Sequence, residues 1–355
     1  MTLTRPRVAE RRENGGVARS LVTIDLGAIR HNARVLCEAV APAELWAVVK
    51  ADGYGHGALD VAGAALQGGA SALCVATVGE ALPLRDAQPE TRILVLGPTD
   101  EGDVATAREA GLELVVSDER LPEGVAVHVK LDTGMGRWGL GELPEPGGAV
   151  VGLMTHLATA DSDRSFAMEQ LERFLRATEP YASRYVRHAA NSAAALNAPE
   201  THLDAVRCGI ALYGVDPEGV DATRFGLRPA LRWESELAQI RQLAPGDSTG
   251  YGRRFVATEE TWIGIVPVGY ADGFRRDLTG TELVVAGGRV PVVGTVSMDA
   301  LAVRLPGPVD AGEPVTLVGD GVTLEAHAVV AGTIGYELAC GIRVPPGRGA
   351  REVVR

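Results

Sequence analysis

The 355-residue sequence predicts an α/β protein: a (β/α)8 TIM barrel followed by a C-terminal, mostly-β domain. Three observations support this prediction. Short apolar runs alternate with helical segments over the first two thirds of the chain, which is the pattern of βα units. Eight such runs occur, the number that closes this kind of barrel. From about Leu231 onward, strand-like segments are joined instead by turns such as PGD and GG.

The eight apolar runs are the predicted barrel strands, and both faces of such strands are covered, so they are apolar throughout. They are WAVVK (46–50), ALCVA (72–76), ILVL (93–96), ELVV (113–116), VAVHVKL (125–131), VVGLMT (150–155), RYVRH (184–188) and AVRCGIAL (205–212). Between Arg137 and Val150 the chain is rich in Pro and Gly, with little room for a helix. We therefore expect the fifth outer helix to be missing or reduced to a loop.

These patterns divide the chain into three parts. Residues 1–19 begin MTLTRPRVAERRENGG, a polar, arginine-rich stretch without the apolar core of a signal peptide, so we predict a disordered tail. Residues 20–231 form the predicted barrel. Residues 232–355 form the β domain, whose strands include LAQIRQL, TWIGIVPVGY, ELVVAGG and VPVVGTV.

Composition excludes several classes of function. The chain has 34 Lys and Arg against 46 Asp and Glu, a net charge of −12, so it lacks the basic surface that nucleic-acid binding needs. No apolar stretch is long enough to span a membrane. The four cysteines are scattered, without a CxxC pair or clustered histidines, which argues against a disulfide scaffold or a metal site. This cysteine usage fits a cytoplasmic protein.

Lys50 stands out because it ends a predicted buried strand, directly before a loop with Gly53, Gly55 and Gly57. A lysine in a dry environment has a lowered pKa and becomes a nucleophilic amine. Such an amine forms a Schiff base with an aldehyde, and pyridoxal 5′-phosphate (PLP) is the common one. The alternative is a lysine that reaches water from the strand end, and Lys50 taken alone favours that alternative.

Several other polar residues lie within or just after predicted strands, and such barrels build their active sites at the C-terminal ends of the strands. They are Lys130, Arg137, His156, Asn191, Ser192 and Arg207. Asn191 and Ser192 would open a helix, either as a phosphate site or as a plain cap, and Gly209 would let backbone amides approach the same phosphate. Arg137 could bind a carboxylate as a fork. An ordinary salt bridge for Lys130 and a core position for His156 remain open.

Taken together, the motifs resemble the alanine racemase family of fold-type III PLP enzymes. The motifs that carry the resemblance, in chain order, are AVVKADGYGHG, KLDTGMGR, THLATAD, HAANSAA, VRCGIALYG, VPVGYADG and GTVSMD. They cover nearly the whole chain after the tail. The sequence departs from the family at its C-terminus, where YELACGIRVPPGR is shortened and no tyrosine precedes Arg343, so we expect a wider entrance to the site.

The resemblance implies roles for the matching positions in the barrel. Lys50 would hold PLP and act as one of two bases. The residues that would bind its phosphate region are Tyr54, Asn191, Ser192, Gly209 and Ile210. Arg207 would face the pyridine nitrogen, and because a guanidinium keeps its proton, that nitrogen would stay unprotonated. His156 would link Arg207 to the second base.

The remaining implied roles involve a partner subunit. Tyr251 would be the second base, supplied by the other chain of a homodimer, and Met298 and Asp299 of that chain would line the substrate end. Arg137 would hold the cofactor's phenolic oxygen and the substrate carboxylate. Lys130 would be carbamylated and would orient Arg137. No metal is implied.

Two bases on opposite faces of the bound amino acid would remove and return its α-proton. The implied function is interconversion of L- and D-alanine, which supplies D-alanine for peptidoglycan. Three alternatives stay open: a racemase of another small amino acid such as serine, a non-catalytic PLP-binding protein and a barrel-type PLP decarboxylase. The β domain with Tyr251 speaks against the non-catalytic class, and Arg207 speaks against the decarboxylases, which use a carboxylate at that place.

Overall fold

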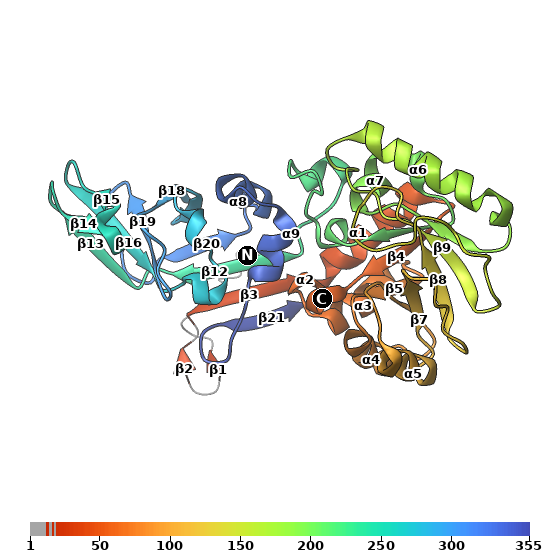
Figure 1. Cartoon of the computed structure of the whole chain (residues 1–355). Helices are drawn as coiled ribbons and strands as arrows, with labels where there is room; N and C mark the ends of the chain where they lie inside the picture. The colour runs from red at the N-terminus through yellow and green to blue at the C-terminus, as the bar shows by residue number, and fades with distance from the viewer. Residues whose placement is uncertain (1–11, 14–15, 18) are drawn as a thin grey trace. The chain divides into compact units, whose positions relative to one another are not determined.

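The computed structural model describes residues 12–13, 16–17 and 19–355 and contains two compact units (Figure 1). One unit is Leu26–Arg228, and the other combines the chain up to Asp25 with Pro229–Arg355. The predicted tail lies largely outside the described residues; within it, β1 (Arg12–Glu13) and β2 (Gly16–Val17) pair antiparallel. No helix in the described ranges is long and apolar enough to cross a membrane.

The first unit is the predicted barrel. Within the described residues, eight parallel strands close on themselves in the order β10-β11-β4-β5-β6-β7-β8-β9. They are β4 (Glu44–Val48), β5 (Ala72–Val75), β6 (Arg92–Val95), β7 (Glu113–Val116), β8 (Ala126–Lys130), β9 (Val150–Met154), β10 (Val186–His188) and β11 (Ala205–Cys208). Every predicted apolar run therefore supplies one strand. Strand β11 is shorter than predicted, because the second half of 205–212 forms the 3-10 helix η4 (Ile210–Tyr213); β8 and β10 are each two residues shorter than their predicted runs.

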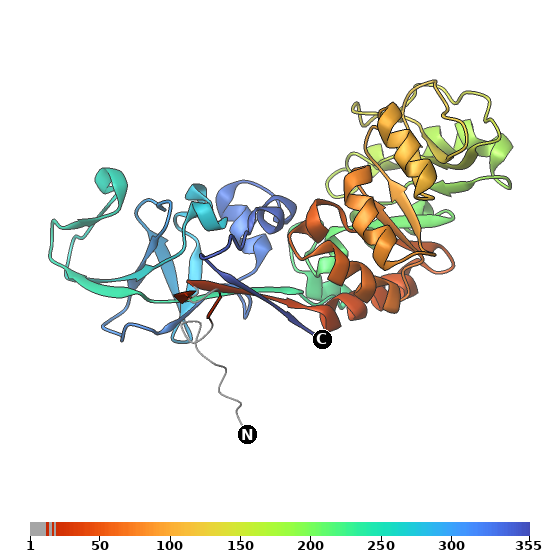
Figure 2. The same cartoon turned by 90° about the horizontal axis from the view of Figure 1, so that it is seen from below.

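The outer layer of the barrel is incomplete. Its helices are α1 (Leu26–Val40), α3 (Ala58–Gln67), α4 (Val78–Ala87), α5 (Glu101–Glu109), α6 (Arg164–Thr178) and α7 (Ser192–Asn197). Helices α1, α3, α4 and α5 follow one another around the outside (Figure 2). In the described chain no helix lies between β8 and β9, which confirms the expected loss of the fifth outer helix. The link between β7 and β8 has no helix either, which was not predicted.

The second unit contains a nine-stranded sheet within the described residues, in the order β13-β16-β19-β18-β17-β20-β12-β3-β21. Its strands are β3 (Ser20–Asp25), β12 (Leu231–Glu236), β13 (Gln239–Leu243), β16 (Thr261–Val266), β17 (Glu282–Val285), β18 (Gly288–Val293), β19 (Leu301–Leu305), β20 (Pro314–Val318) and β21 (Ala350–Val354). A separate pair, β14 (Ser248–Thr249) and β15 (Phe255–Val256), forms a small hairpin. Helices α8 (Leu324–Ala331) and α9 (Gly335–Gly341) complete the unit.

The assignment of residues 20–25 to the barrel is wrong. These residues form β3, which pairs antiparallel with β12, with Ile24 opposite Leu231, and parallel with β21. The strand was visible in the sequence, but its apolar pattern does not say which sheet completes its hydrogen bonds. The barrel unit therefore begins at α1, and its end before β12 lies close to the predicted boundary at residue 231.

Two glycines near α3 give a matched test of the helix packing around the barrel. A Cβ at Gly68 would lie 2.5 Å from the Cβ of Ala33 in α1 and 2.7 Å from the carbonyl oxygen of Arg30. Gly68→Ala is therefore expected to destabilise the barrel by about 1–3 kcal/mol, because the neighbouring helix must move.

Gly63, inside α3, is the control. A Cβ there would meet only the Gln88 side chain, at 4.0 Å. Gly63→Ala should stabilise the protein by about 0.5–1 kcal/mol, because alanine loses less backbone entropy in a helix. Urea denaturation of both variants measures the two effects, and equal shifts in the same direction would contradict the steric argument.

Candidate active site

The barrel brings most of the predicted site residues to the C-terminal ends of its strands. Lys50 follows β4, Lys130 ends β8, His156 follows β9, Asn191 follows β10, and Arg207 lies in β11. The strands are parallel and neighbouring in the closed sheet, so these ends share one face. Residues more than 150 positions apart in the sequence therefore converge on one place.

Lys50 lies in an unusual turn. The strand β4 ends at Val48, two residues earlier than predicted, and Lys50 begins the short segment α2 (Lys50–Tyr54). Ala51, Asp52, Gly53 and Tyr54 all have positive φ, between 51° and 60°. Three of these residues are not glycine, and each left-handed L-residue costs about 1–2 kcal/mol, so the surroundings must impose the turn.

Two carboxylates hold this turn. Glu80, in the first turn of α4, accepts hydrogen bonds from the backbone N–H of Ala51 at 2.8 Å and of Ala76 at 2.7 Å. Asp52 accepts one from the N–H of Ala58 at 2.8 Å. These bonds tie the residues after Lys50 to the starts of α3 and α4, so the lysine extends from a fixed backbone.

Lys50 and Lys130 are the only lysines in a sequence that has 32 arginines. Arginine stays protonated in proteins, whereas lysine can lose its proton when its environment lowers the pKa. A chain that uses arginine almost everywhere keeps lysine at two strand ends of one barrel face. The only two side chains of the sequence that can supply a neutral amine therefore lie at this face.

Lys130 is buried, with 3% of its surface exposed. Burial, followed by the charge of Arg137, lowers its pKa to about 8. Its Nζ lies 5.6 Å from the centre of the Trp138 ring, and the guanidinium carbon of Arg137 lies 5.1 Å from the same ring. The structure therefore places Lys130 and the exposed Arg137 on one aromatic side chain, and Lys130 forms no salt bridge with any residue that the structure describes.

The loop that carries Arg137 is held by Asp132. Its carboxylate accepts hydrogen bonds from the backbone N–H groups of Gly134, Met135 and Gly136, at 2.8–3.1 Å. Burial alone would raise the pKa of Asp132, but these bonds outweigh it and keep the pKa below its usual value. The carboxylate therefore stays ionised and fixes the turn that leads to Arg137.

Arg207 is buried inside the barrel, with 4% of its surface exposed. Its Nη1 donates to Nδ1 of His188 at 2.7 Å. Its Nη2 donates to the carbonyl oxygens of Thr155 at 2.9 Å and Ala189 at 3.2 Å. Burial lowers its pKa to about 10, which still leaves it charged at neutral pH. Among the described residues, its Nε has no acceptor within hydrogen-bond distance.

His156 lies beside Arg207, with its Nδ1 3.3 Å from Nη2. Burial, and then the charge of Arg207, lower the pKa of His156 well below its usual value, so the imidazole is neutral. A guanidinium only donates, so Nδ1 of His156 accepts and its Nε2 carries the proton. His156 therefore has one N–H directed away from Arg207.

A cluster of small groups follows the last two barrel strands. Asn191 caps α7 by accepting from the N–H of Ala194 at 3.1 Å. The buried Oγ of Ser192 accepts from the N–H of Gly209 at 3.0 Å. A Cβ at Gly209 would lie 2.4 Å from Oη of Tyr54, so only glycine fits there. The N–H of Ile210 has no acceptor in the part of the chain that the structure describes.

The predicted residues of the second unit lie on its surface. Tyr251 begins the 3-10 helix η6 (Tyr251–Arg253) and is 72% exposed, and Met298 is 52% exposed. The Oγ1 of Thr295 donates to the carbonyl oxygen of Tyr251 at 2.9 Å, so the two loops are joined. Asp299 accepts from Nη1 of Arg348 at 2.8 Å.

Sequence analysis missed several residues that shape these positions. Arg348 also donates to both carboxylate oxygens of Asp272, at 2.7 and 2.9 Å, and so connects the segment around Asp272 to Asp299. His128 lies between Val127 and Val129 in a predicted strand, and His188 ends another predicted strand; these positions are the sequence signal for buried polar contacts. Nothing in the sequence indicated that His188 contacts Arg207 or that His128 contacts His188.

The chain is similar to known proteins along most of its length. Residues 24–217 match the family described as alanine racemase, N-terminal domain, and residues 230–347 match alanine racemase, C-terminal domain. The alanine racemase of Lactiplantibacillus plantarum is 40% identical over 91% of this chain and 96% of its own. That of Symbiobacterium thermophilum is 39% identical over 93% of this chain and 97% of its own.

Solved structures show the same fold. The crystal structure of alanine racemase from E. faecalis has a TM-score of 0.86 and 37% identity, covering 95% of this chain and 98% of that one. The alanine racemase from D-cycloserine-producing Streptomyces lavendulae has a TM-score of 0.87 and 34% identity, covering 95% and 97%. The resemblance of the motifs is thereby confirmed along both units, and the chain belongs to the alanine racemase family.

Proposed function

We propose that this alanine racemase interconverts L- and D-alanine with PLP as its cofactor, Lys50 as one base and Tyr251 of a partner subunit as the other. The product D-alanine would serve peptidoglycan synthesis. The observation that carries the proposal is that Lys50 and Arg207 lie at the same face of the barrel. Lys50 is held in a left-handed turn at the strand end, and Nε of the buried Arg207 has no acceptor among the described residues.

The groups around the site fit the phosphate and ring of PLP. The N–H of Ile210 and the side chains of Tyr54 and Ser192 would receive the phosphate, and Gly209 leaves room for the Tyr54 hydroxyl. Nε of Arg207 would donate to the pyridine nitrogen. Since Arg207 is a buried cation, it would leave that nitrogen without a proton. Asn191 would act indirectly, by capping the helix that begins with Ser192.

When bound, PLP supplies an electron sink for the α-carbon of the amino acid. The chain's residues would do the proton transfers. Lys50 would remove or return the α-proton on one face, and Tyr251 of the partner subunit would do so on the other. A tyrosine has an ordinary pKa of about 10 and is a weak base near neutral pH. The N–H on Nε2 of His156 would hydrogen-bond to that tyrosine oxygen and so stabilise its ionised form.

A homodimer with shared sites is supported by the surface of the second unit. Tyr251, Met298 and Tyr270 are all large and at least 42% exposed. The backbone N–H of Tyr270 donates to the carbonyl oxygen of Ser297 at 3.1 Å, so the three side chains belong to adjoining loops. Exposed aromatic and methionine side chains gathered in this way are typical of a surface that another protein covers.

Arg137 would bind the substrate carboxylate and the cofactor's phenolic oxygen, and Met298 and Asp299 of the partner would line the substrate end. Lys130 would carry a carbamate. Its pKa of about 8 leaves a useful fraction of neutral amine at neutral pH, and a neutral amine is the form that reacts with CO2. The carbamate would change Lys130 from a cation that opposes Arg137 into an anion that orients it.

We place the enzyme in the cytoplasm. The four cysteines are free thiols in the structure, and two of them, Cys74 and Cys208, are fully buried. Free thiols are typical of a reducing compartment.

Incubation with L-alanine in heavy water tests the reaction. PLP-loaded protein should produce D-alanine with deuterium at the α-carbon, because the second base returns a solvent-derived proton. Exchange without inversion would mean that one base works alone. L-serine in a parallel assay tests the alternative substrate, and a higher kcat/KM for serine than for alanine would overturn the choice of alanine.

Mixed dimers test the shared site. Lys50→Ala and Tyr251→Phe should each lose nearly all activity. When both variants are co-expressed in equal amounts, about a quarter of the wild-type activity should return, since half of the dimers are mixed and each has one complete site. Mixtures that stay inactive while mixed dimers are isolated would place Tyr251 and Lys50 in the same chain's site.

The carbamate at Lys130 is tested with 13C-labelled CO2, and the presence of only two lysines makes the assignment simple. At fixed dissolved CO2, the NMR signal should grow as pH rises through about 8, because the amine of Lys130 loses its proton there. The signal should be absent in Lys130→Met and retained in Lys50→Ala. A signal that depends on Lys50 instead would contradict the proposal.

A further inference from the structure

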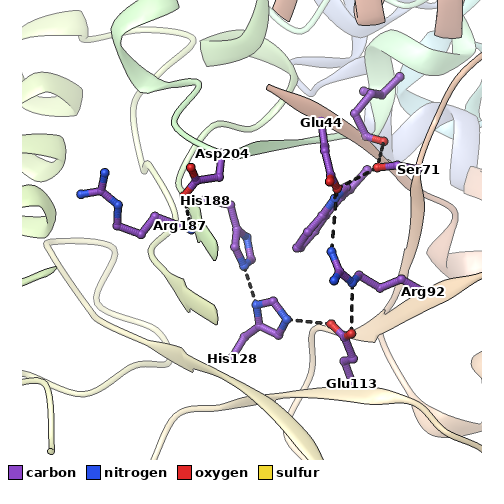
Figure 3. Close-up of polar contacts among 10 residues, drawn as sticks. Glu44, Ser71, Arg92, Glu113, His128, Arg187, His188 and Asp204 are labelled. Carbon is purple, nitrogen blue, oxygen red and sulfur yellow. Dashed lines mark hydrogen bonds and ion pairs between the residues drawn. The ribbon is translucent and has the colours of Figure 1, made fainter. Parts of the chain in front are cut away.

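A line of buried hydrogen bonds leads from Arg207 through the barrel interior to Glu113, at the start of β7. Nη1 of Arg207 donates to Nδ1 of His188 at 2.7 Å. Nε2 of His188 and Nδ1 of His128 are 2.8 Å apart, and Nε2 of His128 is 2.8 Å from Oε2 of Glu113. Figure 3 shows the two histidines and Glu113 in this order. We call these three residues the support chain.

The first contact fixes the direction of all the others. Since a guanidinium only donates, Nδ1 of His188 must be an acceptor. Burial, and then the charge of Arg207, lower the pKa of His188 well below its usual value, so it is neutral and its proton lies on Nε2. That N–H donates to Nδ1 of His128, whose own proton must then lie on Nε2 and point to Glu113. Each tautomer follows from the one before it.

The far end of the support chain is an anion. Burial alone would raise the pKa of Glu113, but the hydrogen bond from His128 and the charge of Arg92 outweigh it and keep the pKa below its usual value. Arg92 donates from Nε to Oε1 of Glu113 at 3.0 Å. His128 is also neutral, because burial lowers its pKa more than Glu113 raises it. The Arg207 cation is therefore linked to the Glu113 anion through the neutral rings of His188 and His128.

The barrel is shaped to hold these rings. Gly152 of β9 lies opposite His128, and a Cβ there would be 2.0 Å from Nδ1 of His128. The absence of a side chain leaves room for the imidazole between β8 and β10. Trp46 packs on both rings, with centroid distances of 5.6 Å to His128 and 4.7 Å to His188. Neither ring can turn without moving its neighbours, so the order of donors and acceptors is kept.

The hydrogen bonds of its two terminal nitrogens therefore fix the orientation of the Arg207 guanidinium. Nη1 is committed to His188 and Nη2 to backbone carbonyls and His156, which leaves Nε as the nitrogen directed at the cofactor. If the guanidinium could tilt, water could reach the pyridine nitrogen and protonate it. With that nitrogen protonated, electron withdrawal by the bound cofactor would be stronger. The amino group of alanine would then more often pass to the cofactor, with water supplying the oxygen of the released pyruvate.

We propose that Glu113, His128 and His188 are positioning residues that hold Arg207 in its orientation toward the cofactor and thereby limit transamination during racemisation. The proposal rests on the proposed function, in which Arg207 faces the pyridine nitrogen. None of the three residues touches substrate or cofactor in this proposal; they act through Arg207.

The tautomers can be measured without any turnover. In PLP-loaded protein with 15N-labelled histidine, His188 and His128 should each show an unprotonated Nδ1 and a protonated Nε2. Single substitutions of the two histidines assign their signals. A protonated Nδ1 on either ring, or an imidazolium at neutral pH, would overturn the proposed direction. This measurement does not depend on which amino acid the enzyme uses.

Variants then test the role. His128→Phe keeps a ring against Trp46 but removes both hydrogen bonds. We expect its kcat to fall about tenfold, the lower end of what outer-shell partners contribute, with KM nearly unchanged and more pyruvate formed per racemisation event. Glu113→Gln keeps an acceptor but removes the charge, so it should show the same shift in pyruvate ratio to a smaller extent. Because Glu113→Gln is nearly isosteric, it remains informative if His128→Phe fails to fold.

The matched control is Glu44→Gln. Glu44 lies at the same end of the barrel, accepts from Nε1 of Trp46 at 2.7 Å and lies 3.8 Å from Nη1 of Arg92, but it is not part of the support chain. In Glu44→Gln, the amount of pyruvate formed per racemisation event should equal that of the wild type. Wild-type protein that does not racemise alanine would contradict the proposed function alone. A racemising wild type whose pyruvate ratio is unchanged by both support-chain variants would overturn this inference.

Discussion

The burial of one guanidinium constrains much of this barrel. Arg207 carries a positive charge in a core made mostly of apolar strands, and such a charge is costly unless its donors are satisfied. Two backbone carbonyls and two neutral histidines satisfy Nη1 and Nη2. The histidines in turn need fixed tautomers, a glycine that leaves space and an ionised carboxylate at the far end. The polar interior of the barrel is thus organised around a single cation.

This constraint also explains why polar residues enter strands that otherwise follow the apolar pattern. Strands β7, β8, β10 and β11 each contribute one member, Glu113, His128, His188 and Arg207. In β7 and β11 the residues beside that member are buried and apolar. Two of these strands, β7 and β8, are the ones that no helix follows in the described chain. Among the described residues, the barrel therefore lacks two outer helices but keeps the line of hydrogen bonds in its interior, which fits a fold that tolerates changes in connecting segments more easily than changes in the core.

The choice between lysine and arginine is the clearest chemical signal in the chain. Arginine can form ion pairs and bind carboxylates, and it serves in these roles at Asp272, Glu113 and Asp216. It cannot act as a base near neutral pH. The only two lysines of the sequence, Lys50 and Lys130, lie at or just after the C-terminal ends of barrel strands. The barrel supplies the environment that lowers the pKa of Lys130, through burial and through Arg137.

The sequence by itself determined the local elements, the number of barrel strands, the missing fifth helix and the family. These follow from apolar runs, turn residues and motifs, all of which are local in the chain. It did not determine that residues 20–25 join the second unit, because a strand's pattern does not name its partner. It also could not show that Glu113, His128, His188 and Arg207, on four different strands, form one line of hydrogen bonds. That arrangement depends on strand register and on the space at Gly152, which only the tertiary structure decides.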